Sequence, residues 1–297
     1  MRTIAVTNHK GGSAKTTTAV NLGAALAAGG RRVLIIDMDP QGSASAWLGV
    51  PNATFNVTRA IRGNADLAEL VHETTAPGVQ LVPSSPTLIV NPGHDESDIA
   101  LGFMRAMDHL PAIWDVVLVD CPPTLGYLAV APLAACQGLL VPVEAHVMAL
   151  AGLASLMAMM ERVRDRLNPG LEVDGILACR INRTNHSRLV VERLRESFPD
   201  LTMRTQVHES IRLAEAPGFH LPITRYAPGS SGDEDYRSAA DELLERLEDA
   251  GEAPAYAAPA QSVLGRVVDT VRSRPWARES AAPVDASEGG GGRIRPR

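Results

Sequence analysis

The chain has 297 residues, enough to bury one large core and carry a tail without disulfides or structural metals. Its cysteines, Cys121, Cys136 and Cys179, show no C-x-x-C spacing, which argues against a zinc site or a disulfide framework and leads us to expect a cytoplasmic protein. A formal net charge of -6 argues against a uniformly basic nucleic-acid binder but is compatible with a local basic patch.

A short apolar strand, a glycine loop and a helix open the chain. Residues 4–6 form the apolar run, and residues 20–26 repeat apolar side chains on one face of a predicted helix. Because the strand begins almost at the first residue, we expect no signal peptide. No apolar run is long enough to span a membrane, so we expect no membrane partner.

The loop between this strand and helix, residues 8–18, has the composition of a phosphate-binding loop. Gly11 and Gly12 allow backbone N–H groups to close around an anion at the positive end of the helix. Lys15 can reach the β- and γ-phosphates, and Thr16 can offer its hydroxyl to Mg²⁺. The predicted nucleotide contacts of the loop are Gly11, Gly12, Ser13, Ala14, Lys15, Thr16 and Thr17.

Two positions of the loop are unusual. Ala14 stands where the pattern G-x-x-x-x-G-K-[ST] has its second glycine, so its backbone must stay in a region open to L-residues. Lys10 is a second lysine without an obvious partner in a folded monomer, and two lysines that converge on one site imply a polyanion. A glycine turn that binds no ligand remains the alternative.

The segment from Lys10 to Thr17, K-G-G-x-x-K-T-T, resembles the deviant Walker A loop of the ParA/MinD family of P-loop ATPases. The resemblance covers roughly the first 245 residues. It implies ATP hydrolysis with ATP and Mg²⁺ as cofactors, and it implies catalytic roles for Lys10 and Lys15, which neutralise the γ-phosphate. In that family the early lysine, here Lys10, reaches across a dimer interface to the nucleotide of the partner subunit.

Two carboxylates follow the second predicted strand. Residues 33–36 form the continuous apolar run expected of a strand that is buried on both faces. Asp37 and Asp39 come next, at the carboxyl end of a parallel strand, where α/β proteins bind ligands; a capped polar turn is the alternative. The run D-x-D-P-Q resembles switch I of the family, which implies that Asp39 orients or activates the attacking water and that Asp37 lies near Mg²⁺.

A third carboxylate ends another buried strand. Residues 116–119 are apolar and lead to Asp120, which we expect at the same sheet edge as the phosphate loop. This is the geometry of a Walker B aspartate that holds Mg²⁺ through water; a helix cap is the alternative. The run D-x-P-P resembles the start of switch II, with Gly126 allowing the backbone to move when the γ-phosphate leaves.

Further strands are predicted at 79–83, 138–143 and 175–179, with a long helix at 147–167. In relatives, polar residues after the last of these strands meet the adenine. The resemblance therefore implies that Asn182 contacts the base and that Arg180 stacks on it, although a capped turn explains either residue equally well.

The stretch R-L-A-E-A-P at 212–217 resembles the ParA branch rather than the MinD or nitrogenase iron-protein branches. Just before it, His208 and Glu209 occupy a place where relatives commonly carry an arginine. His208 is a further candidate nucleotide contact, and whether Glu209 weakens DNA binding stays open. Surface arginines in this half of the family's fold contact DNA phosphates, with a solvated helix face as the alternative. The candidate DNA contacts are Arg183, Arg188, Arg193, Arg195 and Arg212.

The end of the chain changes in composition. Residues 233–250 predict an amphipathic helix that closes an ATPase domain at 1–250. Residues 251–297 are rich in Ala, Pro and Gly, so we expect a largely disordered tail. An apolar stripe beside arginines at 261–273 suggests a short helix, either transient or bound to a membrane or partner.

These patterns predict an α/β fold, a doubly wound and mostly parallel sheet flanked by helices, with the nucleotide at the carboxyl ends of the strands. The resemblance implies a DNA partitioning ATPase. Its expected partners are a second copy of itself, non-specific DNA on the nucleoid and a ParB-like centromere-binding protein. A MinD-like positioning ATPase for a membrane or protein cargo is the alternative.

Overall fold

One eight-stranded sheet runs through the part of the chain that the computed structural model describes, residues 1–88, 96–123, 126–145 and 149–249. The predicted tail at 251–297, with its helix at 261–273, lies outside these residues. Along the sheet the strand order is β3-β4-β2-β5-β1-β6-β7-β8, and every pairing is parallel except that of β3 with β4. The strands are β1 Arg2–Val6, β2 Val33–Asp37, β3 His72–Glu73, β4 Val79–Val82, β5 Val116–Asp120, β6 Gly138–Glu144, β7 Glu172–Ile181 and β8 Thr202–His208.

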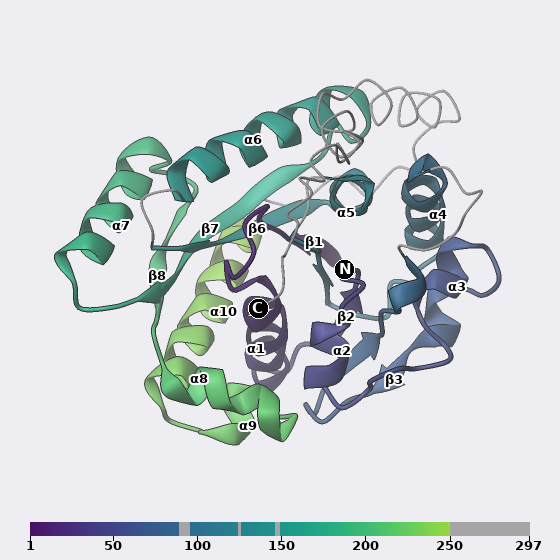
Figure 1. Ribbon diagram of the computed structural model, residues 1–297, viewed down its shortest axis with the longest axis horizontal. Coiled ribbons are helices and arrows are strands. Elements are labelled where there is room, and N and C mark those ends of the chain that lie inside the picture. The colour runs from purple at the N-terminus through teal and green to yellow at the C-terminus, as the bar shows by residue number, and fades with distance from the viewer. Residues whose placement is uncertain (89–95, 124–125, 146–148, 250–297) are drawn as a thin grey trace, which may run out of the picture.

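Helices cover both faces of this sheet, as the doubly wound prediction requires (Figure 1). One face carries α1 Lys15–Ala28, α2 Ser43–Trp47, α8 Ile211–Glu215, α9 Ile223–Tyr226 and α10 Ser231–Asp249. The other carries α3 Val57–Ile61, α4 Glu96–Asp108, α5 Tyr127–Ala135, α6 Ala149–Arg166 and α7 Asn185–Ser197. Short 3-10 helices are η1 Leu67–Leu70, η2 Pro86–Leu88 and η3 Ala216–Phe219. Within the described residues, no helix is both long and apolar enough to cross a membrane.

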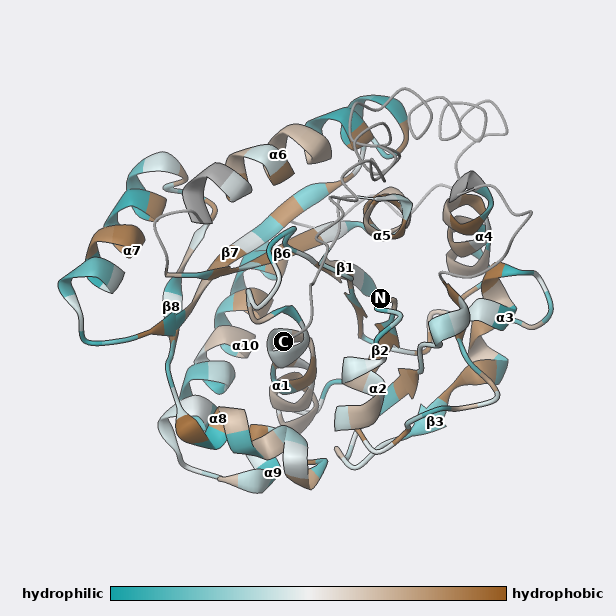
Figure 2. Cartoon of the chain, in the orientation of Figure 1, coloured by the Kyte–Doolittle hydropathy of each residue, from teal (hydrophilic) through white to brown (hydrophobic). Residues whose placement is uncertain are grey.

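The apolar strands are explained by the two cores. In β2, Leu34 and Ile36 pack into the core beneath α4 and α5, whereas Val33 and Ile35 pack into the core beneath α1. Successive side chains of a strand point to opposite faces, so a strand covered on both sides must be apolar at every position. Figure 2 shows hydrophobic residues along the central strands. The prediction of a doubly wound, mostly parallel sheet is therefore confirmed.

The strand order brings the expected site residues to one edge. β1 lies between β5 and β6, and the chain leaves it directly into the glycine loop. Asp37 at the end of β2 is in register with Asp120 at the end of β5, and Val6 of β1 is in register with the same aspartate. Loop and carboxylates therefore meet where open α/β sheets bind their ligands.

Several elements of the structure were not predicted from the sequence, among them α4 and β8. The helix α4 packs against α3 and α5, and the strand β8 closes the sheet beside β7. The ends of β7 and β8 matter for function because they form one side of the pocket described next.

Candidate nucleotide site

The loop that carries β1 into α1 surrounds open space. Gly12 has a φ of 78°, in the left-handed region that favours glycine. A Cβ atom added at Gly11 or Gly12 would meet no atom within 4 Å, so both backbones border a hollow. The first N–H groups of α1, which begins at Lys15, have no partners inside the helix. Together they offer donors and room for an anion such as a phosphate.

Ala14 adopts the left-handed conformation, with φ 67° and ψ 24°. This small region is open to L-residues, so the loop keeps the backbone path of a glycine with a methyl group in place. An ordinary residue there costs on the order of 1 kcal/mol relative to glycine. The departure from the usual pattern is therefore accommodated with backbone strain at Ala14.

The substitution Ala14→Gly is expected to raise the free energy of unfolding by about 1 kcal/mol, because glycine adopts this conformation without strain. In a domain of this size the melting temperature should rise by about 2–4 °C. Ala25→Gly, inside α1 where φ is negative, is the matched control and should lower stability by about 1 kcal/mol. Equal losses in both variants would show that Ala14 is not strained.

Lys15 points its ammonium group into the loop. The residue is 6% exposed, and Nζ donates a hydrogen bond to the carbonyl oxygen of Lys10 at 3.2 Å. Burial lowers the pKa of Lys15, while nearby Asp120 acts in the opposite direction. A buried ammonium group whose partner is a neutral carbonyl is stabilised by an anion beside it, and a bound triphosphate would be such an anion.

The surroundings of the Asp120 carboxylate show whether the site suits a bound cation. Asp120 is fully buried, and its Oδ2 accepts a hydrogen bond from Thr16 Oγ1 at 2.7 Å. The other oxygen, Oδ1, is buried and has no hydrogen-bond partner among the described residues. Burial raises the pKa of Asp120 well above its usual range, and the neighbouring Asp37 adds to the rise. A buried carboxylate with one oxygen that lacks a hydrogen-bond partner, next to a threonine hydroxyl, offers the oxygen ligands that Mg²⁺ and its bound waters prefer.

Asp37 and Asp39 differ in how their carboxylates are used. Asp37 is fully buried and accepts hydrogen bonds from Ser45 N at 2.8 Å, Ser45 Oγ at 2.6 Å and Asp39 N at 3.1 Å. Burial raises the pKa of Asp37 to about 6. Asp39 Oδ1 accepts from Gln41 N at 3.0 Å, and Asp39 borders the pocket. Asp37 therefore supports the turn that presents Asp39.

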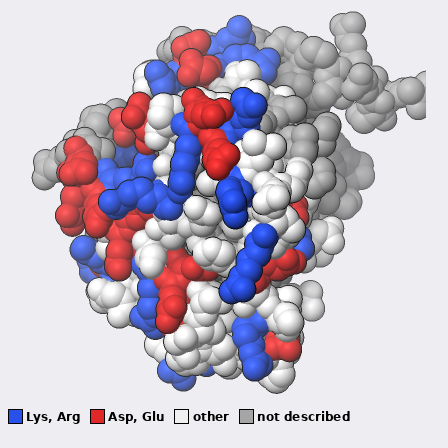
Figure 3. Space-filling model, turned by 90° about the vertical axis from the view of Figure 1, so that its left-hand side faces the viewer, with Lys and Arg blue, Asp and Glu red and all other residues white. Residues whose placement is uncertain are grey.

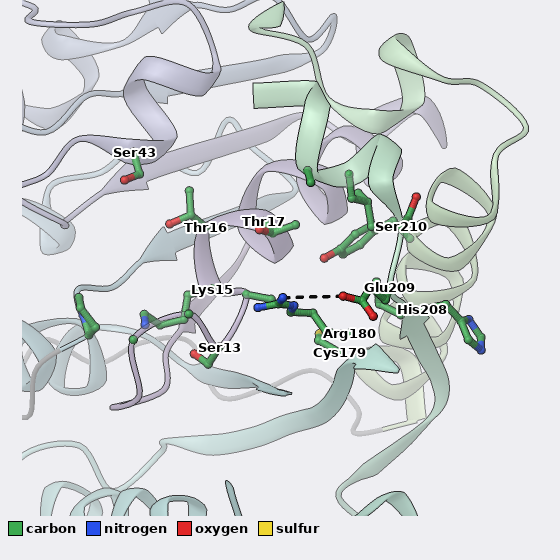
Figure 4. A pocket seen from close by; sticks show the side chains of 18 of the residues that line it. Ser13, Lys15, Thr16, Thr17, Ser43, Cys179, Arg180, His208, Glu209 and Ser210 are labelled. Atoms are coloured by element: carbon green, nitrogen blue, oxygen red, sulfur yellow. Dashed lines mark ion pairs between the residues drawn. The ribbon is translucent and has the colours of Figure 1, made fainter. Parts of the chain in front are cut away.

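A pocket of about 510 Å³ runs from the glycine loop to the ends of β7 and β8 (Figure 4). That volume is within the range of small-molecule sites. Its phosphate side is lined by Gly11, Gly12, Ser13, Ala14, Lys15, Thr16, Thr17, Asp39, Ser43 and Pro123. Its other side is lined by Cys179, Arg180, Val207, His208, Glu209, Ser210, Leu213, Ala214 and Tyr236.

The predicted base contacts are placed differently from one another. Arg180 borders the pocket, and its guanidinium lies 3.9 Å from a carboxylate oxygen of Glu209 (Figure 4). His208 also borders it, but its ring points away from the loop toward Asp235, with Nδ1 3.1 Å from Oδ2. Asn182 does not line this pocket. Its Oδ1 accepts hydrogen bonds from the hydroxyls at the start of α7, as in the capped-turn alternative.

Sequence reasoning missed the apolar wall on the base side. Its members are Cys179, Val207, Leu213, Ala214 and Tyr236. They come from β7, β8, α8 and α10, and most of them meet only because the unpredicted β8 pairs with β7. The alternation of Met203 and Val207 with polar residues is the signal that could have revealed this strand.

The candidate DNA contacts lie on the outer surface of α7 and α8. Arg188, Arg193 and Arg195 are exposed on α7, Arg183 precedes it, and Arg212 is exposed on α8. Two of them have acidic partners: Arg193 pairs with Glu196 at 3.2 Å, and Arg212 with Glu215 at 3.3 Å. Figure 3 shows basic and acidic side chains interleaved on this side of the molecule. The arginines are therefore accessible but do not form an uninterrupted basic stripe.

Comparisons with known proteins agree with this geometry. A family model described as an AAA domain matches residues 1–173. The chromosome-partitioning ATPase Soj of Thermus thermophilus is 40% identical over 251 residues, covering 84% of this chain and 98% of Soj. The chromosome partitioning protein ParA of Myxococcus xanthus is 37% identical over 254 residues, covering 82% of this chain and 88% of that protein.

Among solved structures, cobyrinic acid a,c-diamide synthase of Mycobacterium smegmatis, crystallised with an ATP analogue and magnesium, superposes with a TM-score of 0.70 at 29% identity. That match covers 86% of this chain and all of the synthase chain (100%). The glycine loop, the switch carboxylates, the sheet order and these similarities lead to one assignment: the chain belongs to the ParA/MinD family of P-loop ATPases.

Proposed function

We propose that this protein is a partitioning ATPase: two copies pair over two molecules of Mg·ATP, the pair binds DNA without reading its sequence, and hydrolysis releases the DNA. One observation carries the proposal. The two lysines of the glycine loop point in different directions, since Lys15 lines the pocket and Lys10 does not. A cation at the loop that does not line its own pocket can serve the pocket of a second copy once it leaves its ion-pair partner, Glu144.

Within one protomer, the chain's own residues divide the chemistry. Lys15 and the loop N–H groups neutralise and hold the terminal phosphates, and Thr16 with Asp120 forms the site for the cation. Mg²⁺ held there would supply positive charge that offsets the negative charge of the phosphates. Asp39 sits at the pocket border, where it aligns the attacking water. Hydrolysis by this arrangement depends on positioning and electrostatics, with no covalent intermediate.

The arginines of α7 supply the proposed DNA contacts. Arg188 is exposed on the outer face of the helix, and none of the ion pairs among the described residues involves it. Contacts of this kind bind the phosphate backbone and are weakened by salt. A ParB-like partner that stimulates hydrolysis is part of the same proposal, and Soj and ParA, the similar proteins, carry chromosome-partitioning names.

The proposal is tested by mobility shifts on unrelated DNA duplexes with ATP, with ADP and without nucleotide, across a series of salt concentrations. Binding should require ATP and ignore sequence. Arg188→Glu should weaken binding and lower the magnitude of the salt slope by about 1. Arg105→Glu, exposed on α4, is the matched control and should bind like the wild type. Binding that ignores the nucleotide would refute the proposal, and ATP-dependent pairing without DNA binding would favour a protein or membrane cargo.

A further inference from the structure

Glu144 connects the phosphate loop to the base side of the site. It is the last residue of β6, and its carboxylate makes two ion pairs within one protomer. Oε2 lies 3.5 Å from Lys10 Nζ, and Oε1 lies 3.2 Å from Arg180 Nη1. Each carboxylate oxygen serves one cation, so Glu144 is the shared partner of Lys10 and Arg180.

Hydrogen bonds of Asn8 explain why Lys10 meets Glu144. The side-chain amide of Asn8 donates to the carbonyl oxygen of Pro142 at 2.8 Å, and its Oδ1 accepts from the backbone N–H of Lys10 at 3.2 Å. The backbone of Lys10 is thereby tied to β6 two residues before Glu144. The ammonium group of Lys10 consequently lies beside the strand end and not in the pocket of its own protomer.

We propose that Glu144 is a positioning residue that holds Lys10 within its own protomer until two ATP-loaded copies meet. The inference rests on the proposed pairing through Lys10. A triphosphate and a carboxylate compete for one ammonium group, so Lys10 must leave Glu144 before it reaches the nucleotide of a second copy. When it leaves, Glu144 remains paired with Arg180, and no partly buried charge loses all its partners. The exchange is therefore possible, with Glu144 setting how readily it occurs.

The composition of the chain supplies a direct readout of this contact. Lys10 and Lys15 are its only lysines, and its other strongly basic side chains are arginines. The side chain of Lys10 is 36% exposed, whereas that of Lys15 is buried. A brief pulse of an amine-acylating ester, followed by digestion and mass spectrometry, therefore reports the availability of Lys10.

In the nucleotide-free protein, Glu144→Gln should accelerate acylation of Lys10 by about 2- to 5-fold, the range set by a partly exposed ion pair. Glu209→Gln is the matched control, because it removes the other carboxylate near Arg180 without touching Lys10. Lys10 of this variant should be acylated at the wild-type rate. An unchanged rate in Glu144→Gln would overturn the inference, and so would the same acceleration in both variants.

Sedimentation with ATP gives the second readout. Two Lys10–Glu144 pairs break for each dimer formed, so Glu144→Gln should lower the dimer dissociation constant by about 4- to 25-fold. Weaker pairing in this variant would overturn a restraining role, because Glu144 would then direct Lys10 toward the partner. If the wild type never pairs with ATP, the proposed function fails, while the nucleotide-free acylation still decides whether Glu144 holds Lys10.

Discussion

Replacing Lys15 by alanine is expected to lower the rate of ATP hydrolysis by about 100- to 1,000-fold. Lys15 is 6% exposed, and its ammonium group lies inside the glycine loop with the Lys10 carbonyl as its hydrogen-bond acceptor. A charge fixed in this position stabilises negative charge on the γ-phosphate without first having to reorganise. The substitution keeps the backbone of the loop but removes that charge, and a water molecule cannot replace the ammonium group with the same geometry.

The fold itself should survive this substitution. The hydrogen bond lost from Lys15 to the Lys10 carbonyl is worth about 1 kcal/mol, and removing a buried ammonium group offsets part of that loss. The nucleotide-free variant should therefore melt close to the wild type. A ligand at 100 times its dissociation constant stabilises by about 2.7 kcal/mol, so calorimetry with saturating ATP should reveal whether binding is weakened as well. Hydrolysis at the wild-type rate would show that the phosphates are held elsewhere.

Most of the sheet could be predicted from the sequence because parallel strands buried on both faces have a simple signature. Residues 33–36 and 116–119 are apolar at every position, and each is followed by an aspartate at the carboxyl edge. The edge strand β8 lacks that signature. Met203 and Val207 are buried, whereas Arg204 is exposed and pairs with Glu242 and Glu245 of α10. Contacts with β7 and α10 stabilise this strand, and the alternation of Met203 and Val207 with polar residues, although it indicates a strand, does not identify those partners.

The same limit applies to the site. Loop residues such as Lys15 and Thr16 are neighbours in the sequence, so their chemistry could be predicted from spacing alone. Glu144 is 134 residues from Lys10, and only the pairing of β1 with β6 brings them together. Asn182 illustrates the converse. Its amide could equally contact a base or cap a turn, and the hydroxyl groups that bond it in the structure belong to α7 and its cap.

The second large effect is expected at Asp39. Removing its carboxylate should reduce the turnover number by about 100-fold or more, because a positioned carboxylate that aligns and activates water contributes on that scale. The Michaelis constant should change little, since Lys15, Thr16 and Asp120 hold the phosphates and the cation without it. Pairing with ATP should therefore persist, and DNA should remain bound for as long as the nucleotide is intact.

The substitution Asp39→Asn separates the effect of the carboxylate charge from the effect of the hydrogen bond within the turn. Asp39 Oδ1 accepts a hydrogen bond from Gln41 N at 3.0 Å, and an asparagine oxygen can accept the same bond. Asp39→Asn should thus melt like the wild type while hydrolysing ATP as slowly as Asp39→Ala. Single-turnover hydrolysis, followed beside DNA release on the same samples, measures both consequences. If Asp39→Asn hydrolyses ATP normally, the water is aligned by another group. If Asp39→Asn hydrolyses ATP slowly but releases DNA at the wild-type rate, DNA release does not depend on hydrolysis. The proposed cycle must then be abandoned even though Asp39 is catalytic.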